Sequence, residues 1–394
     1  MNALVLGESL EVLIDHRGKT PKKLGGDFTA SGVPVASALS VRNGRLDLSQ
    51  PRFIPEQIYK KWMPEPTRRG DVLLTSEAPA GRVARVTDDS PLVLGQRLFG
   101  LRGRDGVLDS GFLYYALQSD AVQQSILGHS TGTTVVGIRQ SALRQVRIPA
   151  PSFAEQVAIA EVLGALDDKI AANTALAEAI DRYLACLFEK SASAVPDVPL
   201  ASIADVNRSS VRPQPGRALR YIDIASVGTG SFEYPHRSPW DDAPGRARRG
   251  VTPGDTIWST VRPNRRSHAL VLDDDPELVA STGLAVLSPR EVGFAYLYEA
   301  TKRPTFSGYL ENVAEGSAYP AVRADRFLDA PIPLVDAATR AAFENVASPL
   351  RRLVASANRE NRSLAETRDS LLPHLMSGKL RVRDAEAIAA AAGV

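Results

Sequence analysis

The sequence predicts an α+β protein with a pseudo-two-fold internal repeat: two similar globular domains separated by two long helices that form an antiparallel coiled coil. Two observations carry this prediction. Residues 152–190 contain no proline and show a sustained heptad pattern of apolar residues, which is typical of a helix that pairs with another helix. A similar pattern returns 184 residues later, and landmarks of the intervening chain recur at the same offset, which indicates a duplication.

The first globular domain, residues 1–150, is expected to contain short strands separated by turns. Residues 4–14 have a period that fits either a strand or a short helix, and the pattern does not decide between them. The other predicted elements are a hairpin turn at Asn43-Gly44, a short helix over 54–62, strands after Gly70 and Gly81, and a helix over 112–126.

The first long helix is predicted from Ser152 to Lys190, because Ser152 and Glu155 form a capping-box pattern at its start. Apolar residues then recur at alternating spacings of four and three, with one asparagine among them. At ~1.5 Å per residue the helix would span about 55 Å, and its seam requires a partner. The predicted seam positions are Ile159, Leu163, Leu166, Ile170, Asn173, Ile180 and Leu184.

The second globular domain, residues 196–335, repeats the landmarks of the first. Adding 184 carries Gly70-Asp71 onto Gly254-Asp255, Gly132 onto Gly316, Arg139 onto Arg323 and Pro149 onto Pro333. A strand is therefore predicted after Gly254, and a helix over 294–300. The predicted segments of the chain are 1–150 and 196–335 for the two domains, 151–195 and 336–380 for the long helices, and 381–394 for a C-terminal tail.

The second long helix is predicted from Asp336 to Met376. Pro349 is expected to kink it or delay its start, and Gly378 is expected to cap its end. Arg368 falls on the seam, where it could pair across the coil, and the alanine-rich last ten residues are expected to fray. The seam on this helix is predicted at Leu350, Val354, Asn361, Leu364 and Leu371, and the two seam asparagines would set the register.

Composition excludes several classes of protein. Hydrophobic residues make up 44% of the chain, which is enough for packed cores and excludes global disorder. A single cysteine, Cys186, excludes a disulfide framework and a cysteine-based zinc site. The sequence has no run of eighteen apolar residues and no basic, apolar leader at its N-terminus, so we expect a soluble, cytoplasmic protein without a membrane span.

The sequence carries no enzyme signature. It lacks a GxxxxGK[ST] phosphate loop, a GxGxxG turn after a strand and an aromatic-terminated Pro-Pro motif. Its histidines, at positions 16, 129, 236, 268 and 374, have no metal-ligand spacing. The acidic run at 273–277 is interpreted as a solvated turn. We therefore predict no catalytic residue, no metal ligand and no cofactor bound by this chain.

Cationic and hydroxyl side chains on glycine- and proline-broken loops favour contact with DNA, because arginine can bind a guanine edge and Ser or Thr can hold phosphates. Residues 1–150 carry 19 Lys/Arg and 14 Asp/Glu, whereas residues 196–335 carry 16 and 17. The second domain would therefore depend on clustered rather than total charge. The predicted DNA contacts are Arg17, Lys19, Lys22, Arg42, Arg45, Thr75, Arg82, Thr133, Thr134 and Arg139, and then Arg208, Arg212, Thr260, Arg262, Asn264, Arg265, Ser317, Tyr319 and Arg323.

These motifs resemble the specificity subunit of type I restriction-modification systems, over nearly the whole chain. The resemblance rests on residues 132–139 running into 148–156, on 163–170, on 254–263, and on 364–380. It implies two target recognition domains, each reading one half of a split site in double-stranded DNA, held apart by the paired helices. It also implies two modification subunits with S-adenosylmethionine docked on the helices, and restriction subunits that use ATP and Mg.

One departure from the family pattern occurs at residues 336–340, where a Glu-Gln pair like Glu155-Gln156 would be expected. Docking of the second modification subunit would then be less symmetrical. Two alternatives stay open at this point: a specificity subunit for another phage-defence methyltransferase system, or a stand-alone DNA-modifying enzyme with degenerate motifs.

Overall fold

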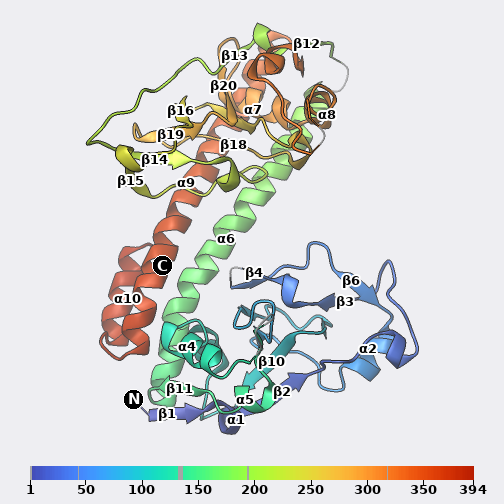
Figure 1. The fold of residues 1–394 in the computed structure, drawn as a ribbon, viewed down its shortest axis with the longest axis vertical. Coiled ribbons are helices and arrows are strands. Elements are labelled where there is room, and N and C mark those ends of the chain that lie inside the picture. The colour runs from blue at the N-terminus through green and yellow to red at the C-terminus, as the bar shows by residue number, and fades with distance from the viewer. Residues whose placement is uncertain (1, 43, 132–135, 193–194, 317) are drawn as a thin grey trace. The chain divides into compact units, whose positions relative to one another are not determined.

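The structure is a computed structural model that describes residues 2–42, 44–131, 136–192, 195–316 and 318–394. The chain forms two compact units (Figure 1): unit 1 comprises residues 1–171 and 361–394, and unit 2 comprises residues 172–360. Each unit therefore contains one globular part together with a segment of each long helix. The segment boundaries predicted from the sequence, which separate helices from globular parts, stay a prediction.

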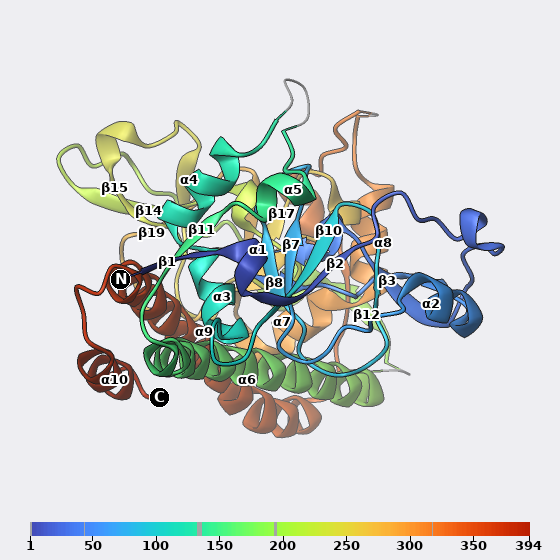
Figure 2. The same cartoon turned by 90° about the horizontal axis from the view of Figure 1, so that it is seen from below.

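Unit 1 is built on two small sheets and a strand pair. The first sheet is antiparallel (Figure 2), the second contains one parallel pair, and the strand pair joins the first strand of the chain to the last strand before the long helix. The first sheet has the order β2 (Leu10–Asp15), β10 (Leu98–Gly103), β7 (Val72–Thr75) and β8 (Val83–Arg85), and the second has the order β6 (Arg52–Ile54), β3 (Val33–Ala36) and β9 (Val93–Leu94). The strand pair is β1 (Asn2–Val5) with β11 (Arg147–Ala150). A separate hairpin is formed by β4 (Val41–Arg42) and β5 (Arg45–Leu46).

Unit 2 repeats the two sheets and the strand pair and adds one strand to the second sheet, which confirms the predicted duplication; among the described residues it has no strand pair that corresponds to β4 and β5. Its second sheet again contains one parallel pair, β14 with β19, where unit 1 has β3 with β9. The first sheet has the order β13 (Ala204–Val206), β20 (Leu284–Pro289), β17 (Thr256–Ser259) and β18 (His268–Leu270). The second has the order β15 (Arg237–Pro239), β14 (Ala218–Ile222), β19 (Leu278–Ser281) and β16 (Ala247–Gly250). The strand pair is β12 (Asp197–Pro199) with β21 (Pro331–Pro333).

The Gly-Asp landmark has a structural reason in both units. Gly70 and Gly254 have φ of 91° and 99°, a left-handed conformation that favours glycine. The following aspartate then turns back onto the chain: Asp71 accepts from Arg68 N at 2.9 Å, and Asp255 accepts from Thr252 N at 2.8 Å. The pair therefore closes the turn that leads into the buried central strand, β7 or β17.

The short helices predicted over 54–62 and 294–300 are present, whereas α5 and α8 were not predicted. Residues 4–14 form β1, α1 and β2 in succession, and residues 112–126 form two helices rather than the single helix predicted. The break occurs because the Ser119 hydroxyl donates to Ala116 O at 2.7 Å, which ends the first helix. These helices are α1 (Leu6–Ser9), α2 (Glu56–Trp62), α3 (Ser110–Ala116), α4 (Asp120–Gly128), α5 (Gln140–Leu143), α7 (Phe294–Lys302) and α8 (Pro304–Asn312).

The two long helices are α6 (Phe153–Ala192) and α9 (Ala337–Met376). The predicted capping box is present, since Ser152 Oγ accepts from Glu155 N and Glu155 Oε2 accepts from Ser152 N. The N-cap of α9 is Asp336, whose carboxylate accepts a hydrogen bond from Thr339 N at 3.0 Å. Pro349 lies inside α9, so the predicted delay of its start is wrong: the Asp336 cap begins the helix earlier.

Gly378 ends α9 with a φ of 69°, as predicted for a C-cap. The predicted fraying of the last residues is wrong, because α10 (Val382–Ala391) folds back after α9 (Figure 1). Ala385 and Ala389 of α10 are buried in one core with Leu371 and Leu375 of α9. Burial of this alanine face stabilises the tail as a helix.

The long helices pair antiparallel within each unit. In unit 1, Arg368 Nη1 donates to Asp167 Oδ1 at 2.6 Å, which is the cross-coil pair that the sequence suggested. In unit 2, Asn173 Nδ2 donates to Glu360 Oε2 at 2.7 Å and Arg351 Nη2 to Asp181 Oδ1 at 2.8 Å. Of the predicted seam, the buried members are Ile159, Leu163, Leu166, Asn173, Ile180, Leu184, Leu364 and Leu371, and the half-buried members are Ile170, Leu350, Val354 and Asn361.

Candidate nucleic-acid interface

In each unit, a segment that is distant in the sequence is hydrogen-bonded to the loop that follows the central strand. In unit 2, Glu315 and Ala321 exchange two backbone hydrogen bonds of 2.9 Å, and Val322 N donates to Thr260 O at 2.8 Å. In unit 1, Thr131 and Gly137 exchange bonds of 2.9 and 3.0 Å, and Ile138 N donates to Ser76 O at 2.8 Å. We call residues 76–81 and 260–266 the strand-exit loops. Their geometry is therefore duplicated along with the sheets.

The strand-exit loop of unit 2 presents a stacked arginine. Arg262 has a φ of 52° and is followed by Pro263, and its backbone N–H donates to Pro320 O at 2.7 Å. Its guanidinium lies 4.6 Å from the ring centroid of Tyr319, whose side chain is 69% exposed. Stacking on an aromatic ring restrains the guanidinium while leaving its N–H fork available to a base edge or a phosphate.

Three further cationic or amide side chains surround this stack. Asn264 and Arg265 are exposed in the short helical turn Pro263–Arg265, and Arg265 has no ion pair among the residues that the structure describes. Arg323 is exposed and lies 3.8 Å from Glu315, both largely in solvent. A screened, exposed pair of this kind contributes little to stability, so Arg323 can exchange Glu315 for a phosphate at small cost.

The strand-exit loop of unit 1 has the same backbone but a different side chain. Ala78, with a φ of 59°, precedes Pro79 at the position of Arg262 and Pro263. The nearby Arg17 is engaged internally: its Nη2 donates to Asp15 Oδ2 at 2.6 Å, and its guanidinium lies 4.5 Å from the Phe99 ring centroid. The loop of unit 1 therefore lacks a stacked arginine, although Arg139, the counterpart of Arg323, is exposed beside it.

The predicted contact residues fall into different environments. Thr75 is fully buried, where it donates to Pro79 O and accepts from Arg82 N, so its hydroxyl is not accessible to DNA. Thr260 is half-buried and donates to Gly283 O at 2.9 Å, and the Lys19 ammonium donates to Trp62 O at 2.9 Å. Thr133, Thr134 and Ser317 lie outside the described residues. The exposed members are Lys22, Arg42, Arg45, Arg82, Arg139, Arg208, Arg212, Asn264, Arg265, Tyr319 and Arg323.

Sequence reasoning missed two arginines of unit 1. Arg52 lies on β6 and stacks on Phe28, with its guanidinium 4.0 Å from the ring centroid. Arg97 precedes β10 and has a φ of 70°. No local motif marks either residue. The signal that singles them out is structural, since both face a hollow whose walls come from several separate segments.

The base of the unit 2 strand-exit loop is fixed by a buried histidine. His268 Nδ1 bonds Arg266 O at 2.6 Å, which assigns the proton to that nitrogen, and the imidazole stacks on Trp258 at 4.6 Å between centroids. Burial lowers the pKa of His268 to about 4. The ring is therefore neutral at pH 7, and His268 acts as a hydrogen-bond donor that holds the loop rather than as a charged group.

No group of three metal-ligating side chains occurs in the part of the chain that the structure describes. Across the same ranges, no helix combines the length and the apolar character that a membrane crossing requires.

Comparison with known proteins places these features in a context. Residues 5–182 match the family described as Type I restriction modification DNA specificity domain. Two curated relatives from Methanocaldococcus jannaschii are the specificity subunits of type I restriction enzymes MjaIX, 33% identical over 138 residues, and MjaVIII, 28% identical over 149 residues. These matches cover 35% and 36% of this chain but only 31% and 35% of the relatives, about a third of their length.

A solved structure resembles the whole chain. The crystal structure of the S subunit of a type I restriction-modification system from M. genitalium aligns over 95% of both chains, with a TM-score of 0.61 and 18% identity. At this identity the likeness concerns the fold alone. It confirms the predicted α+β fold class with long paired helices.

Proposed function

We propose that the chain is the non-catalytic, DNA-reading subunit of a type I restriction-modification complex, from the premise that residues 5–182 match the family of type I restriction modification DNA specificity domains. The observation that carries the proposal is the duplicated strand-exit loop, presented by two units of the same topology. A scaffold that is repeated while its surface side chains differ is suited to reading two DNA segments of different sequence.

We propose that the two units read the two halves of a bipartite site in double-stranded DNA. In unit 2 the stacked Arg262 and the exposed Asn264 and Arg265 are suited to base edges, because Arg and Asn are side chains that recognise guanine and adenine. Arg323 is suited to a phosphate. The long helices would set the distance between the two half-sites.

We propose that two modification subunits dock on the long helices. Support comes from large apolar side chains that stay exposed on them in unit 2: Leu176 and Tyr183 on α6 are 42% and 53% exposed, and Val346 and Leu353 on α9 are 40% and 45% exposed. Each pair is spaced by one heptad and therefore shares a helix face. The modification subunits would carry S-adenosylmethionine, and restriction subunits would use ATP and Mg.

The test is selection of bound DNA from a random duplex pool by the full chain co-purified with its modification subunits. The expected result is an enriched motif of two short blocks separated by a fixed number of unread base pairs. Methylation in the host should map to the same motif and disappear when this gene is deleted. A single continuous motif, or methyl transfer by the purified chain alone, would contradict the proposal.

A further inference from the structure

Unit 1 contains a hollow of about 340 Å³ beside β3 that is lined by cations and apolar side chains. Its walls include Lys19, Phe28, Arg52, Gln96 and Arg97, and no lining residue is acidic. These residues come from loops and strands that are far apart in the sequence. The hollow therefore concentrates positive potential at a concave surface with apolar walls, which strengthens attraction for an anion.

The charge of Arg52 is not neutralised within the protein. Its guanidinium is restrained by the Phe28 ring at 4.0 Å, and it has no ion pair among the described residues. Lys19 Nζ donates one hydrogen bond of 2.9 Å to the backbone carbonyl of Trp62. A carbonyl positions the ammonium without cancelling its charge, and two of its three N–H groups remain for a ligand.

Arg97 occupies a backbone position that glycine fills in unit 2. Ser76 N donates to Arg97 O at 2.9 Å, and at the equivalent place Thr260 N donates to Gly283 O at 2.9 Å. Arg97 has a φ of 70°, which costs a residue with a Cβ about 1 kcal/mol, whereas Gly283 is not in the left-handed region. Its Nε lies 2.8 Å from Glu77, whose side chain is 38% exposed and does not line the hollow. The strained backbone is therefore found at Arg97 and not at Gly283.

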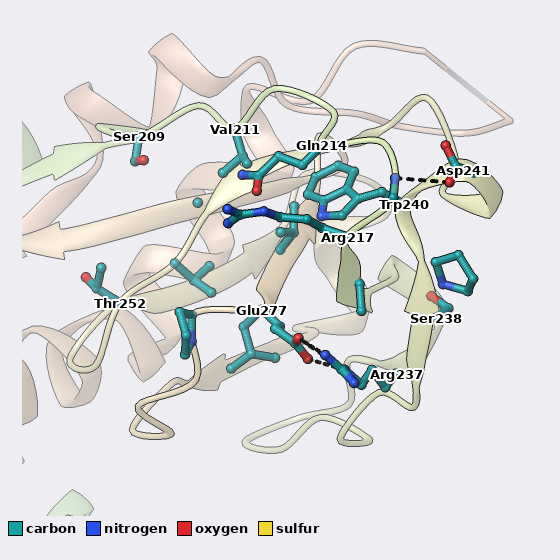
Figure 3. Close-up of a pocket in the computed structure, with 18 residues that line it drawn as sticks. Ser209, Val211, Gln214, Arg217, Arg237, Ser238, Trp240, Asp241, Thr252 and Glu277 are labelled. Atoms are coloured by element: carbon teal, nitrogen blue, oxygen red, sulfur yellow. Dashed lines mark hydrogen bonds and ion pairs between the residues drawn. The ribbon is translucent and has the colours of Figure 1, made fainter.

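The equivalent strand of unit 2, β15, also carries an arginine, and this arginine has a carboxylate partner. Arg52 pairs with Val35 on β3, and Arg237 pairs with Arg220 on β14. Val35 corresponds to Tyr221, because these residues pair with Val93 and Val279 of the parallel strands. Arg237 therefore lies one residue away from the position of Arg52. Figure 3 shows that Arg237 is clamped by Glu277, with contacts of 2.7 and 2.9 Å. Arg237 lines a different hollow, of about 920 Å³, in which that ion pair satisfies its charge. Arg52 has no such carboxylate partner among the described residues.

We propose that Lys19, Arg52 and Arg97 hold one phosphate of the DNA backbone next to the half-site read by unit 1. The proposal rests on the proposed function and deepens it. Lys19, Arg52, Arg97 and the Gln96 amide offer mainly hydrogen-bond donors, which suits a phosphate with its several acceptor oxygens. Arg97 would bind the phosphate while it shares its exposed ion pair with Glu77. The contact would give a cationic anchor to a unit whose strand-exit loop has Ala78 where unit 2 has Arg262.

The test compares Arg52→Ala and Lys19→Ala with Lys60→Ala, in the full chain with its modification subunits. Lys60 is a matched control because it is a cation on α2 of the same unit, 73% exposed and away from the hollow. Affinity is measured over a range of salt concentrations for the selected site and for a scrambled duplex. Each hollow variant should bind both duplexes about tenfold more weakly at low salt, and the slope of log K against log salt should fall by about 0.9.

Arg52→Lys should restore most of that slope, because it returns the charge, and thermal unfolding should show all variants folded. Equal affinities for Arg52→Ala and Lys60→Ala would overturn the proposal. A changed base preference in one half-site would also overturn it, because the hollow would then read bases. If the unaltered complex binds no duplex DNA, the proposed function fails as well, and this outcome is seen before any variant is compared.

Discussion

At the scale of single residues, duplication has preserved backbone geometry and changed side chains. Ala78 and Arg262 share a left-handed φ before a proline, but only Arg262 has a stacked guanidinium. Asp71 and Asp255 close the same turn, but Asp71 accepts from buried Arg102 at 2.8 Å whereas Asp255 accepts from Ser288 at 2.6 Å. Turn geometry is constrained by the strand that follows, while the exposed side chains are free to diverge.

Replacing Arg262 and Arg265 by alanine should weaken specific binding at one half-site, by ~1–3 kcal/mol for each base that an arginine reads. Relaxed base preference in that half of the motif, with the other half unchanged, is the expected readout of a selection experiment. Arg326→Ala provides the control, because Arg326 is also exposed on unit 2 but lies outside the strand-exit loop. Uniformly weaker binding to all sequences would mean that these arginines contact phosphates only.

The buried His268 leads us to predict how the stability of unit 2 depends on pH. Its pKa is lowered from 6.5 to about 4 by burial, so the unfolded state takes up a proton before the folded state does. Above pH 6.5, protonation of His268 therefore does not affect the free energy of unfolding of unit 2. As the pH falls from 6.5 towards 4, this free energy decreases by up to about 3 kcal/mol. Urea unfolding followed by tryptophan fluorescence checks this.

His268→Asn should be less stable at pH 7 but should lose less stability between pH 6.5 and 4. His236→Asn, at an exposed histidine, should behave as the unaltered chain does. An unaltered pH dependence in His268→Asn would show that other groups govern acid unfolding.

At the scale of elements, the two repeats begin equivalent helices in different ways. In unit 1, Asp109 caps α3 itself by accepting from Phe112 N at 2.7 Å. In unit 2 the equivalent residue is Gly293, and Glu344 of α9 reaches over to accept from Tyr296 N and Ala295 N at the start of α7. Burial raises the pKa of the Glu344 carboxyl. Glu344 of α9 is equivalent to Ala160 of α6. The carboxylate gained at this position of α9 therefore supplies the N-terminal cap that α7 lacks, because Gly293 replaces the capping aspartate.

This exchange predicts a rescue. Glu344→Ala should cost about 1 kcal/mol by leaving the start of α7 without its cap. Gly293→Asp alone should destabilise further, because a Cβ at Gly293 would lie 2.0 Å from Glu344 Cδ. The double variant recreates the Asp109–Ala160 arrangement and should recover stability relative to Gly293→Asp. Chemical denaturation of the four chains gives the coupling energy, and additive losses would contradict the compensation.

At the scale of the whole molecule, unit 1 depends on a segment that the chain supplies last. Leu163 and Leu166 of α6 share a core with Leu364 and Leu371 of α9, which come much later in the sequence. Unit 2, in contrast, is one continuous stretch, residues 172–360. Each unit also buries residues of both long helices, so the helices are parts of the two cores as well as connections.

Under the proposed function, inserting one heptad into both long helices, after residues 171 and 360, should change the preferred DNA spacer. Seven residues add about 10 Å of helix, which corresponds to about three base pairs at ~3.4 Å each. Both seams keep their register because the insertion is a whole heptad. Selection of bound DNA measures the spacer, a heptad inserted in α6 alone is the mismatched control, and an unchanged spacer in the double insertion would count against a spacing role.

The sequence by itself determined the features that depend on neighbours along the chain. Heptad spacing and the Ser152–Glu155 box identified α6, and a constant offset identified the duplication and the second helix, because periodicity and caps are local properties. The prediction that Arg368 pairs across the coil also followed from its seam position.

Only the tertiary structure decided which distant groups meet. It placed Thr75 inside a core, brought Arg52 and Arg97 to one hollow, and supplied Glu344 to a helix that lacks its own cap. It also stabilised the alanine-rich tail as α10 against Leu371 and Leu375. None of these pairings leaves a mark in the local sequence, because burial and charge compensation arise from segments that become neighbours only when the chain has folded.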